Sequence, residues 1–144
     1  MLCPGLDQMN GLERLCIEGT NTLLLEMPFV AWNHHLMETL ESLLFDDRYT
    51  ILFAHIDRYL DQLDLLEYYD YHAQLNVESL KSWHNRKKLL HLAEFGRISA
   101  IGSDLHGVSK GYDYFTKCSG FLGEFLPGIL ESSEKLLTGA KPVH

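Results

Sequence analysis

Six side chains with metal-binding or phosphate-binding chemistry lie at the ends of short apolar segments in this chain. They are Glu26, His55, Arg58, Asn76, Asp104 and His106. Carboxylate oxygens and neutral imidazole nitrogens are mixed ligands that suit Mn²⁺, Fe²⁺ and Zn²⁺. A pair of such ions polarises a phosphoryl oxygen and makes hydroxide available near neutral pH. The residue types therefore predict metal-dependent hydrolysis of a phosphate ester.

The spacing of these residues adds detail. Asp104 and His106 are separated by one residue, so both can point into one pocket and reach different metal ions. Arg58 follows His55 by three residues and carries the planar guanidinium that holds a phosphate through two hydrogen bonds. We therefore expect Arg58 to bind phosphate beside a metal centre.

Each residue alone has a structural alternative. Glu26 is also compatible with a paired charge in the core, and His55 with a hydrogen-bonded structural histidine. An aspartate after a strand, such as Asp104, also serves as a helix cap. A lone arginine such as Arg58 commonly forms a surface salt bridge. It is the joint pattern, at successive strand ends, that favours a site.

The elements that must position these residues alternate along the chain. Apolar runs predict buried strands at 22–27, 49–54, 72–76 and 98–102. Helical periodicity predicts helices at 33–45, 60–69, within 79–95, at 112–122 and at 124–137, with a break near Pro127 and Gly128. This order is typical of an α/β fold with a parallel sheet covered by helices. Periodicity leaves open whether the sheet is flat and doubly wound or an arc of a barrel.

Composition limits the partners. The chain has 144 residues, which predicts a single domain over 1–144, and its formal net charge of -8 disfavours nucleic acid and anionic lipid. A phosphorylated substrate therefore needs local positive charge. Three widely spaced cysteines without a CxxC pair favour a reduced, cytoplasmic setting, and no apolar run is long enough to insert stably into a membrane.

Four ordered segments carry a family resemblance. They are Leu-Leu-Leu-Glu-Met-Pro-Phe at 23–29, Ile-Leu-Phe-Ala-His-Ile-Asp-Arg-Tyr at 51–59, Gln-Leu-Asn at 74–76 and Ile-Gly-Ser-Asp-Leu-His-Gly at 101–107. Over about 15–119, the chain resembles the PHP-domain, metal-dependent tyrosine-protein phosphatases of the CpsB/CapC type, bacterial enzymes encoded with capsule and exopolysaccharide genes. The resemblance implies parallel βα repeats that form about the C-terminal half of a distorted seven-stranded PHP barrel, which is TIM-like.

The resemblance also implies site roles. A multinuclear site, typically of Mn²⁺ and alternatively of Fe²⁺ or Zn²⁺, would be held by Glu26, His55, Asp104 and His106. Arg58 would hold the substrate phosphate, and Arg58 and Asp104 would be catalytic. We expect Asn76 and Lys110 to contact substrate as well. The implied reaction is direct hydrolysis of phosphotyrosine on a protein such as a bacterial tyrosine kinase.

Two departures from the family pattern matter. The family begins with a His-x-His strand that this chain lacks, so we expect the chain to begin inside the second half of the barrel. Its first strand would then have an unpaired edge that promotes self-association, and activity would be weak. Lys110 stands near the place of a family arginine and would act as a point charge. Two other functions stay open: a PHP-type phosphoesterase for a small phosphorylated metabolite, and a vestigial fragment without catalysis.

Overall fold

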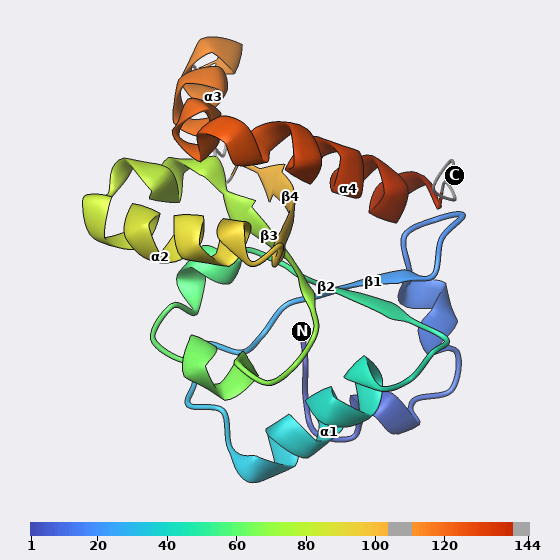
Figure 1. The fold of residues 1–144 in the computed structure, drawn as a ribbon. Helices are drawn as coiled ribbons and strands as arrows, with labels where there is room; N and C mark the ends of the chain where they lie inside the picture. The colour runs from blue at the N-terminus through green and yellow to red at the C-terminus, as the bar shows by residue number, and fades with distance from the viewer. Residues whose placement is uncertain (104–110, 140–144) are drawn as a thin grey trace.

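Four parallel strands form the centre of the molecule (Figure 1). The computed structural model describes residues 1–103 and 111–139. The strands are β1 (Thr22–Leu25), β2 (Thr50–Phe53), β3 (His72–Asn76) and β4 (Ile98–Gly102). Each strand pairs in parallel with the next one along the chain, so the order is β1-β2-β3-β4. The predicted α/β fold with a parallel sheet is confirmed.

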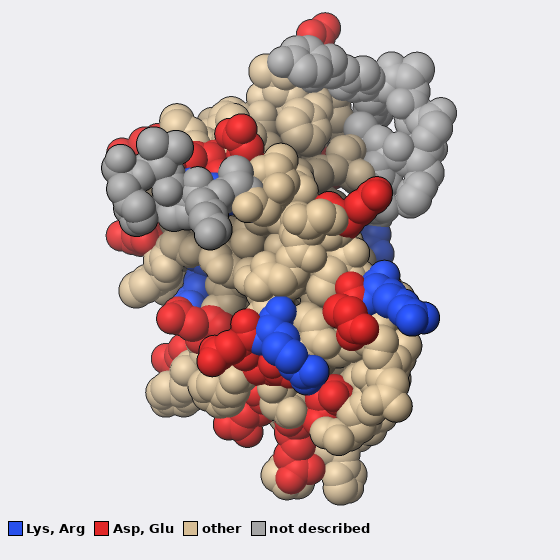
Figure 2. Space-filling view, turned by 90° about the vertical axis from the view of Figure 1, so that its right-hand side faces the viewer, with Lys and Arg blue, Asp and Glu red and all other residues tan. Residues whose placement is uncertain are grey.

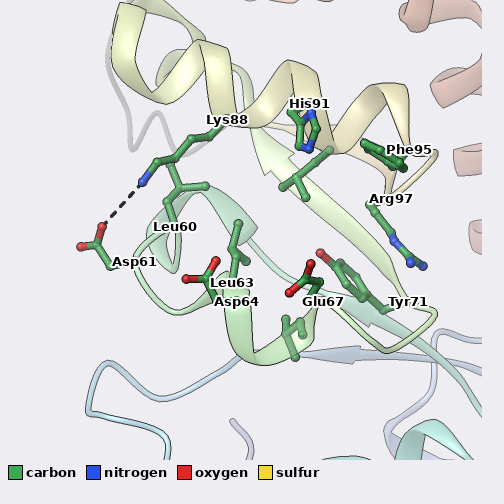
Figure 3. A pocket seen from close by; sticks show the side chains of 12 residues that line it. Leu60, Asp61, Leu63, Asp64, Glu67, Tyr71, Lys88, His91, Phe95 and Arg97 are labelled. Atoms are coloured by element: carbon green, nitrogen blue, oxygen red, sulfur yellow. Dashed lines mark ion pairs between the residues drawn. The ribbon is translucent and has the colours of Figure 1, made fainter.

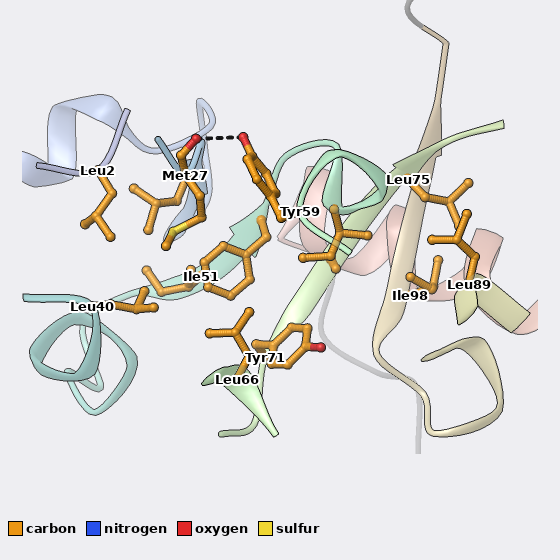
Figure 4. Close-up of a cluster of buried hydrophobic side chains, with 14 of the residues drawn as sticks. Leu2, Met27, Leu40, Ile51, Tyr59, Leu66, Tyr71, Leu75, Leu89 and Ile98 are labelled. Atoms are coloured by element: carbon orange, nitrogen blue, oxygen red, sulfur yellow. Dashed lines mark hydrogen bonds between the residues drawn. The ribbon is translucent and has the colours of Figure 1, made fainter. Parts of the chain in front are cut away.

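Helix α1 (His34–Leu44) covers one face of this sheet. Asn33 caps the helix, because its side chain accepts a hydrogen bond from the backbone N–H of Leu36 at 2.9 Å. Leu36 and Leu40 of the helix are buried in the same apolar cluster as Ile51 of β2. Figure 4 shows the two sides of this cluster, with Leu40 and Ile51 together at one end. Burial of the apolar stripe explains why the helix forms where the sequence predicts it.

The second connection is not the helix predicted at 60–69. It contains two short 3₁₀ helices, η3 (Ile56–Arg58) and η4 (Leu63–Leu66). Leu60, Leu63 and Leu66 recur every three residues, which matches the three residues per turn of a 3₁₀ helix. The prediction was wrong because the apolar period here is three rather than 3.6.

The third connection contains the predicted helix. After η5 (Val77–Lys81), helix α2 extends over Trp83–Glu94 and buries Leu89 and Ala93. Ser82 caps its first turn through a 3.5 Å hydrogen bond from Asn85 N–H. The helix ends just before Gly96, as the sequence predicts.

The C-terminal part contains α3 (Gly111–Ser119), η6 (Gly120–Phe125) and α4 (Leu126–Thr138). The break lies at Gly123, with φ 53° and ψ -124°, and not at the predicted Pro127 and Gly128. Pro127 instead sits in the first turn of α4, where its missing N–H costs no helical hydrogen bond. Helix α4 lies on the side of the sheet opposite α1 (Figure 1). Thr22 Oγ1 of β1 donates to the carbonyl of Leu136 at 2.7 Å.

The edge of the sheet at β1 is largely covered by the preceding chain. The carbonyl of Thr22 accepts from Ile17 N–H at 2.8 Å, and the carbonyl of Glu26 accepts from Leu2 N–H at 2.7 Å. Leu24 lies between them, and its side chain is 51% exposed. The unpaired edge expected for β1 is therefore reduced to the neighbourhood of Leu24. Within the described ranges, no helix combines the length and apolarity needed to cross a bilayer.

Candidate metal and phosphate site at the strand ends

Glu26 and His55 meet at the carboxyl ends of β1 and β2. The register pairs Leu25 with Phe53, so the residues that follow the two strands leave the sheet side by side. Glu26 Oε1 lies 3.2 Å from His55 Nε2. The structure thus brings together the two predicted metal ligands that lie within its described residues.

The two atoms are at ion-pair distance, but their geometry is not that of a hydrogen bond. His55 Nε2 is buried and has no hydrogen-bond partner, although the Glu26 oxygen is close. A buried imidazole nitrogen without a partner costs free energy, and nearly all such atoms in proteins are satisfied. A divalent cation accepts both a nitrogen and a carboxylate oxygen, so the pair fits a metal ion as ligand chemistry.

The backbone of His55 is strained. Its φ of 37° and ψ of 56° lie in the left-handed region, and it is the only residue besides glycine with positive φ in the described ranges. That conformation costs about 1 kcal/mol or more for a residue with a Cβ atom. The backbone N–H of His55 donates to Gln74 Oε1 at 2.6 Å, which holds the turn from β3. Such strain persists where the surroundings fix it, often at functional sites.

Tyr59 closes the inner side of this pair. Its hydroxyl donates to the carbonyl of Met27 at 2.7 Å (Figure 4), and its ring lies 5.7 Å from the ring of His55. Burial of the phenol, and then the nearby charge of Glu26, raise the pKa of Tyr59 to about 12. The Tyr59 side chain beside the pair is therefore uncharged at physiological pH.

Asn76 ends β3 at the same edge of the sheet, but its side-chain oxygen and its backbone N–H are engaged. Its Oδ1 accepts from Gln74 Nε2 at 3.1 Å, and its backbone N–H donates to Asp57 Oδ1 at 2.8 Å. Asp57 Oδ2 also accepts from the hydroxyl of Ser79 at 2.5 Å. These three residues and Gln74 form what we call the Asp57 network. The structure thus gives Asn76 a structural role, and its predicted contact with substrate stays a prediction.

Close packing beside β4 supports the Asp57 network. A Cβ atom at Gly102 would lie 2.6 Å from Gln74 Nε2, so a larger residue there would displace the end of the Gln74 side chain. The register of β3 and β4 shifts between Ala73 and Gln74, which sets Asn76 opposite Gly102. Sequence analysis gave Gln74 and Asp57 no role, since their contacts arise only between segments that the fold brings together.

Arg58 is exposed and lies beside Phe29, whose ring stacks with His55. It belongs to η3, directly after His55, and its guanidinium carbon lies 5.9 Å from the centre of the Phe29 ring. Acidic side chains are spread over the face shown in Figure 2, with few basic ones among them. In a chain with a formal net charge of -8, Arg58 supplies the local positive charge that a phosphate would need. The predicted site residues Asp104, His106 and Lys110 lie outside the described residues.

Glu78 is a further polar residue that the sequence did not single out. One carboxylate oxygen, Oε1, accepts from the hydroxyl of Ser103, which follows β4. The other, Oε2, is buried and has no hydrogen-bond partner. In 1–103 and 111–139, no group of three or more His, Cys, Asp or Glu lies close enough to hold a metal ion. Glu78 is thus a separate feature from the Glu26–His55 pair.

A groove of about 680 Å³ lies elsewhere, between η4 and α2 (Figure 3). One wall carries Asp61, Asp64 and Glu67, and the other carries Lys88, His91 and Arg97. Lys88 Nζ lies 4.0 Å from Asp61 Oδ1, and Arg97 pairs with Asp70. Because Arg97 precedes β4, the groove extends toward the amino ends of the strands. It is therefore distinct from the site at Glu26 and His55.

Comparison of the chain with protein-family models, curated proteins and solved structures finds no match.

Proposed function

We propose that this protein is a metal-dependent phosphatase that hydrolyses phosphotyrosine on proteins. The observation that carries the proposal is the Glu26–His55 pair, with its buried Nε2 atom that has no hydrogen-bond partner. A structural histidine would be expected to use both ring nitrogens, as buried polar atoms do. A bound divalent cation would satisfy the imidazole nitrogen and the carboxylate together.

The strand order supports the barrel part of the proposal. A doubly wound sheet reverses its strand order at a switch point, and the ligand binds there. Here the order β1-β2-β3-β4 is consecutive without reversal, as in an arc of a βα barrel. We propose that this arc belongs to a seven-stranded PHP-type barrel. The polar residues lie at the carboxyl ends of its strands, where barrel enzymes carry their chemistry.

The residues of this chain would divide the work. Glu26 and His55 would hold the cation, with Asp104 and His106 as the further ligands that the resemblance implies. When bound, the cation polarises the phosphoryl oxygen and lowers the pKa of a water molecule. Arg58 would bind the phosphate through two hydrogen bonds and orient it. Gln74 would hold the backbone of His55 in place through the 2.6 Å hydrogen bond.

Metal titration tests the proposal. We expect the chain to bind Mn²⁺ in isothermal calorimetry, and His55→Ala to weaken that binding by at least about tenfold. His84→Ala, a change at an exposed histidine on α2, is the matched control and should leave binding unchanged. Equal Mn²⁺ affinity in His55→Ala and the parent protein would contradict the site. A protein without stoichiometric metal would favour the vestigial alternative.

Substrate choice is tested separately. With Mn²⁺ present, we expect hydrolysis of a phosphotyrosine peptide and a large loss of turnover in Arg58→Ala. Preferential hydrolysis of a small phosphorylated metabolite would instead favour the second open alternative. A surface salt bridge at Arg58 would predict almost no change in turnover.

A further inference from the structure

Phe29 is an exposed aromatic ring held beside the candidate site. It follows Glu26 by three residues, and 61% of its surface is exposed. Its ring is nearly parallel to the ring of His55, with an interplanar angle of 6° and centroids 6.4 Å apart. The centroid of Tyr59 lies 5.7 Å away. Phe29 is therefore placed by ring contacts while most of its surface faces solvent.

The two residues before Phe29 are held by hydrogen bonds from neighbouring side chains. The carbonyl of Met27 accepts from the Tyr59 hydroxyl at 2.7 Å, and the carbonyl of Pro28 accepts from Trp32 Nε1 at 3.1 Å. Pro28 also has a fixed φ, which reduces the freedom of this segment. The position of the Phe29 ring is thus set by the fold, and the ring does not sit on a loosely attached loop.

Arg58 links this ring to phosphate binding. Its guanidinium carbon lies 5.9 Å from the centre of the Phe29 ring, within the range of a cation–π contact. A phosphate held by Arg58 would bring its ester group close to the exposed part of Phe29. Val30, 66% exposed, extends the apolar surface from the next position.

We infer that Phe29 is a specificity-determining residue whose ring stacks against the aromatic group of an aryl phosphate. This inference rests on the proposed function and deepens it. Aromatic rings attract each other in offset stacks with centroids about 4.5–7 Å apart. An alkyl phosphate would reach the same Arg58 but would lack the stacked contact. Phe29 would therefore favour phosphotyrosine over phosphoserine or a sugar phosphate.

Binding of two non-hydrolysable phosphonates tests this role without relying on turnover. In calorimetry with Mn²⁺ present, the protein should bind phenylphosphonate about tenfold more tightly than methylphosphonate. Phe29→Ala should weaken phenylphosphonate binding far more than methylphosphonate binding, so that the preference is lost. Phe29→Leu, which keeps apolar bulk, should lose most of the preference, and Phe29→Trp should keep it. Phe45→Ala, at another largely exposed ring directly after α1, should match the parent protein.

The outcomes separate the two proposals. If the parent protein binds neither phosphonate, the proposed function fails and the inference fails with it. If it binds both equally, the phosphate site stands and the role of Phe29 is overturned. If Phe29→Ala weakens both phosphonates to the same degree, the ring only positions Arg58 or His55, and the inference is again overturned.

Discussion

Two clusters of polar residues lie at the same edge of the sheet and differ in whether their polar atoms form hydrogen bonds. In the Asp57 network, both carboxylate oxygens accept hydrogen bonds, and the Asn76 side chain is bonded as well. In the Glu26–His55 pair, a buried ring nitrogen lies at ion-pair distance from a carboxylate but has no hydrogen-bond partner, and the backbone of His55 is strained. The first arrangement stabilises the fold. The second keeps a nitrogen atom without a hydrogen bond and a strained backbone, as binding sites for ligands do.

The largest effect should come from the Asp57 network. We expect Asp57→Ala to lower the free energy of unfolding by about 3 kcal/mol, because a buried backbone N–H and a hydroxyl lose their acceptor. Urea denaturation measures the change. Asp61→Ala, at a fully exposed carboxylate near Lys88, is the control and should show no measurable change. A loss no greater than that of the control would mean that the Asp57 network does not stabilise the fold.

A smaller effect should come from the strained backbone of His55. Asparagine tolerates the left-handed region better than alanine does, so His55→Asn should be about 1 kcal/mol more stable than His55→Ala. Denaturation of the two variants side by side measures this difference. Equal stability of the two variants would show that strain at this position is negligible. The pair would then differ from the Asp57 network in hydrogen bonding alone.

A further effect, confined to alkaline pH, should appear at the tyrosine that borders the Glu26–His55 pair. The pKa of Tyr59 is raised from 10.0 to about 12, so the folded state holds this proton more tightly than the unfolded state. Stability should therefore be unaffected by Tyr59 below pH 10 and should fall as the pH rises toward about 12. Denaturation midpoints across this window measure the slope.

Tyr59→Phe removes the ionising group and should give a shallower slope. Glu26→Gln should also reduce the slope, since the charge of Glu26 contributes to the shift. An unchanged slope in both variants would mean that other groups, such as buried Tyr71, account for the alkaline loss.

The sequence predicted the strands well because buried parallel strands are apolar throughout. The predicted ranges at 72–76 and 98–102 match β3 and β4. Strand β1 is two residues shorter than predicted at its C-terminal end, and β2 is one residue shorter at each end. The predicted proximity of Glu26 and His55 follows from their places after neighbouring parallel strands. The helices were predicted from the spacing of apolar residues. That prediction was wrong at 60–69, where leucines recur every three residues.

Other features of the site could not be read from the sequence. The left-handed backbone of His55 has no signature, because glycine is the usual residue in that conformation. The contacts of Gln74 depend on a register shift inside the β3–β4 pair. In the sequence, Phe29 is simply an apolar residue after a proline. Its exposure and its ring contacts become apparent only when its neighbours in space are known. These features arise from tertiary contacts between segments far apart in the chain.

The hydrogen bond between Thr22 and Leu136 joins residues 114 positions apart. During synthesis, β1 leaves the ribosome before the part of α4 that accepts this bond has been made. Contacts of such long range slow folding. The bond between β1 and α4 is thus expected to form only after α4 has been synthesised.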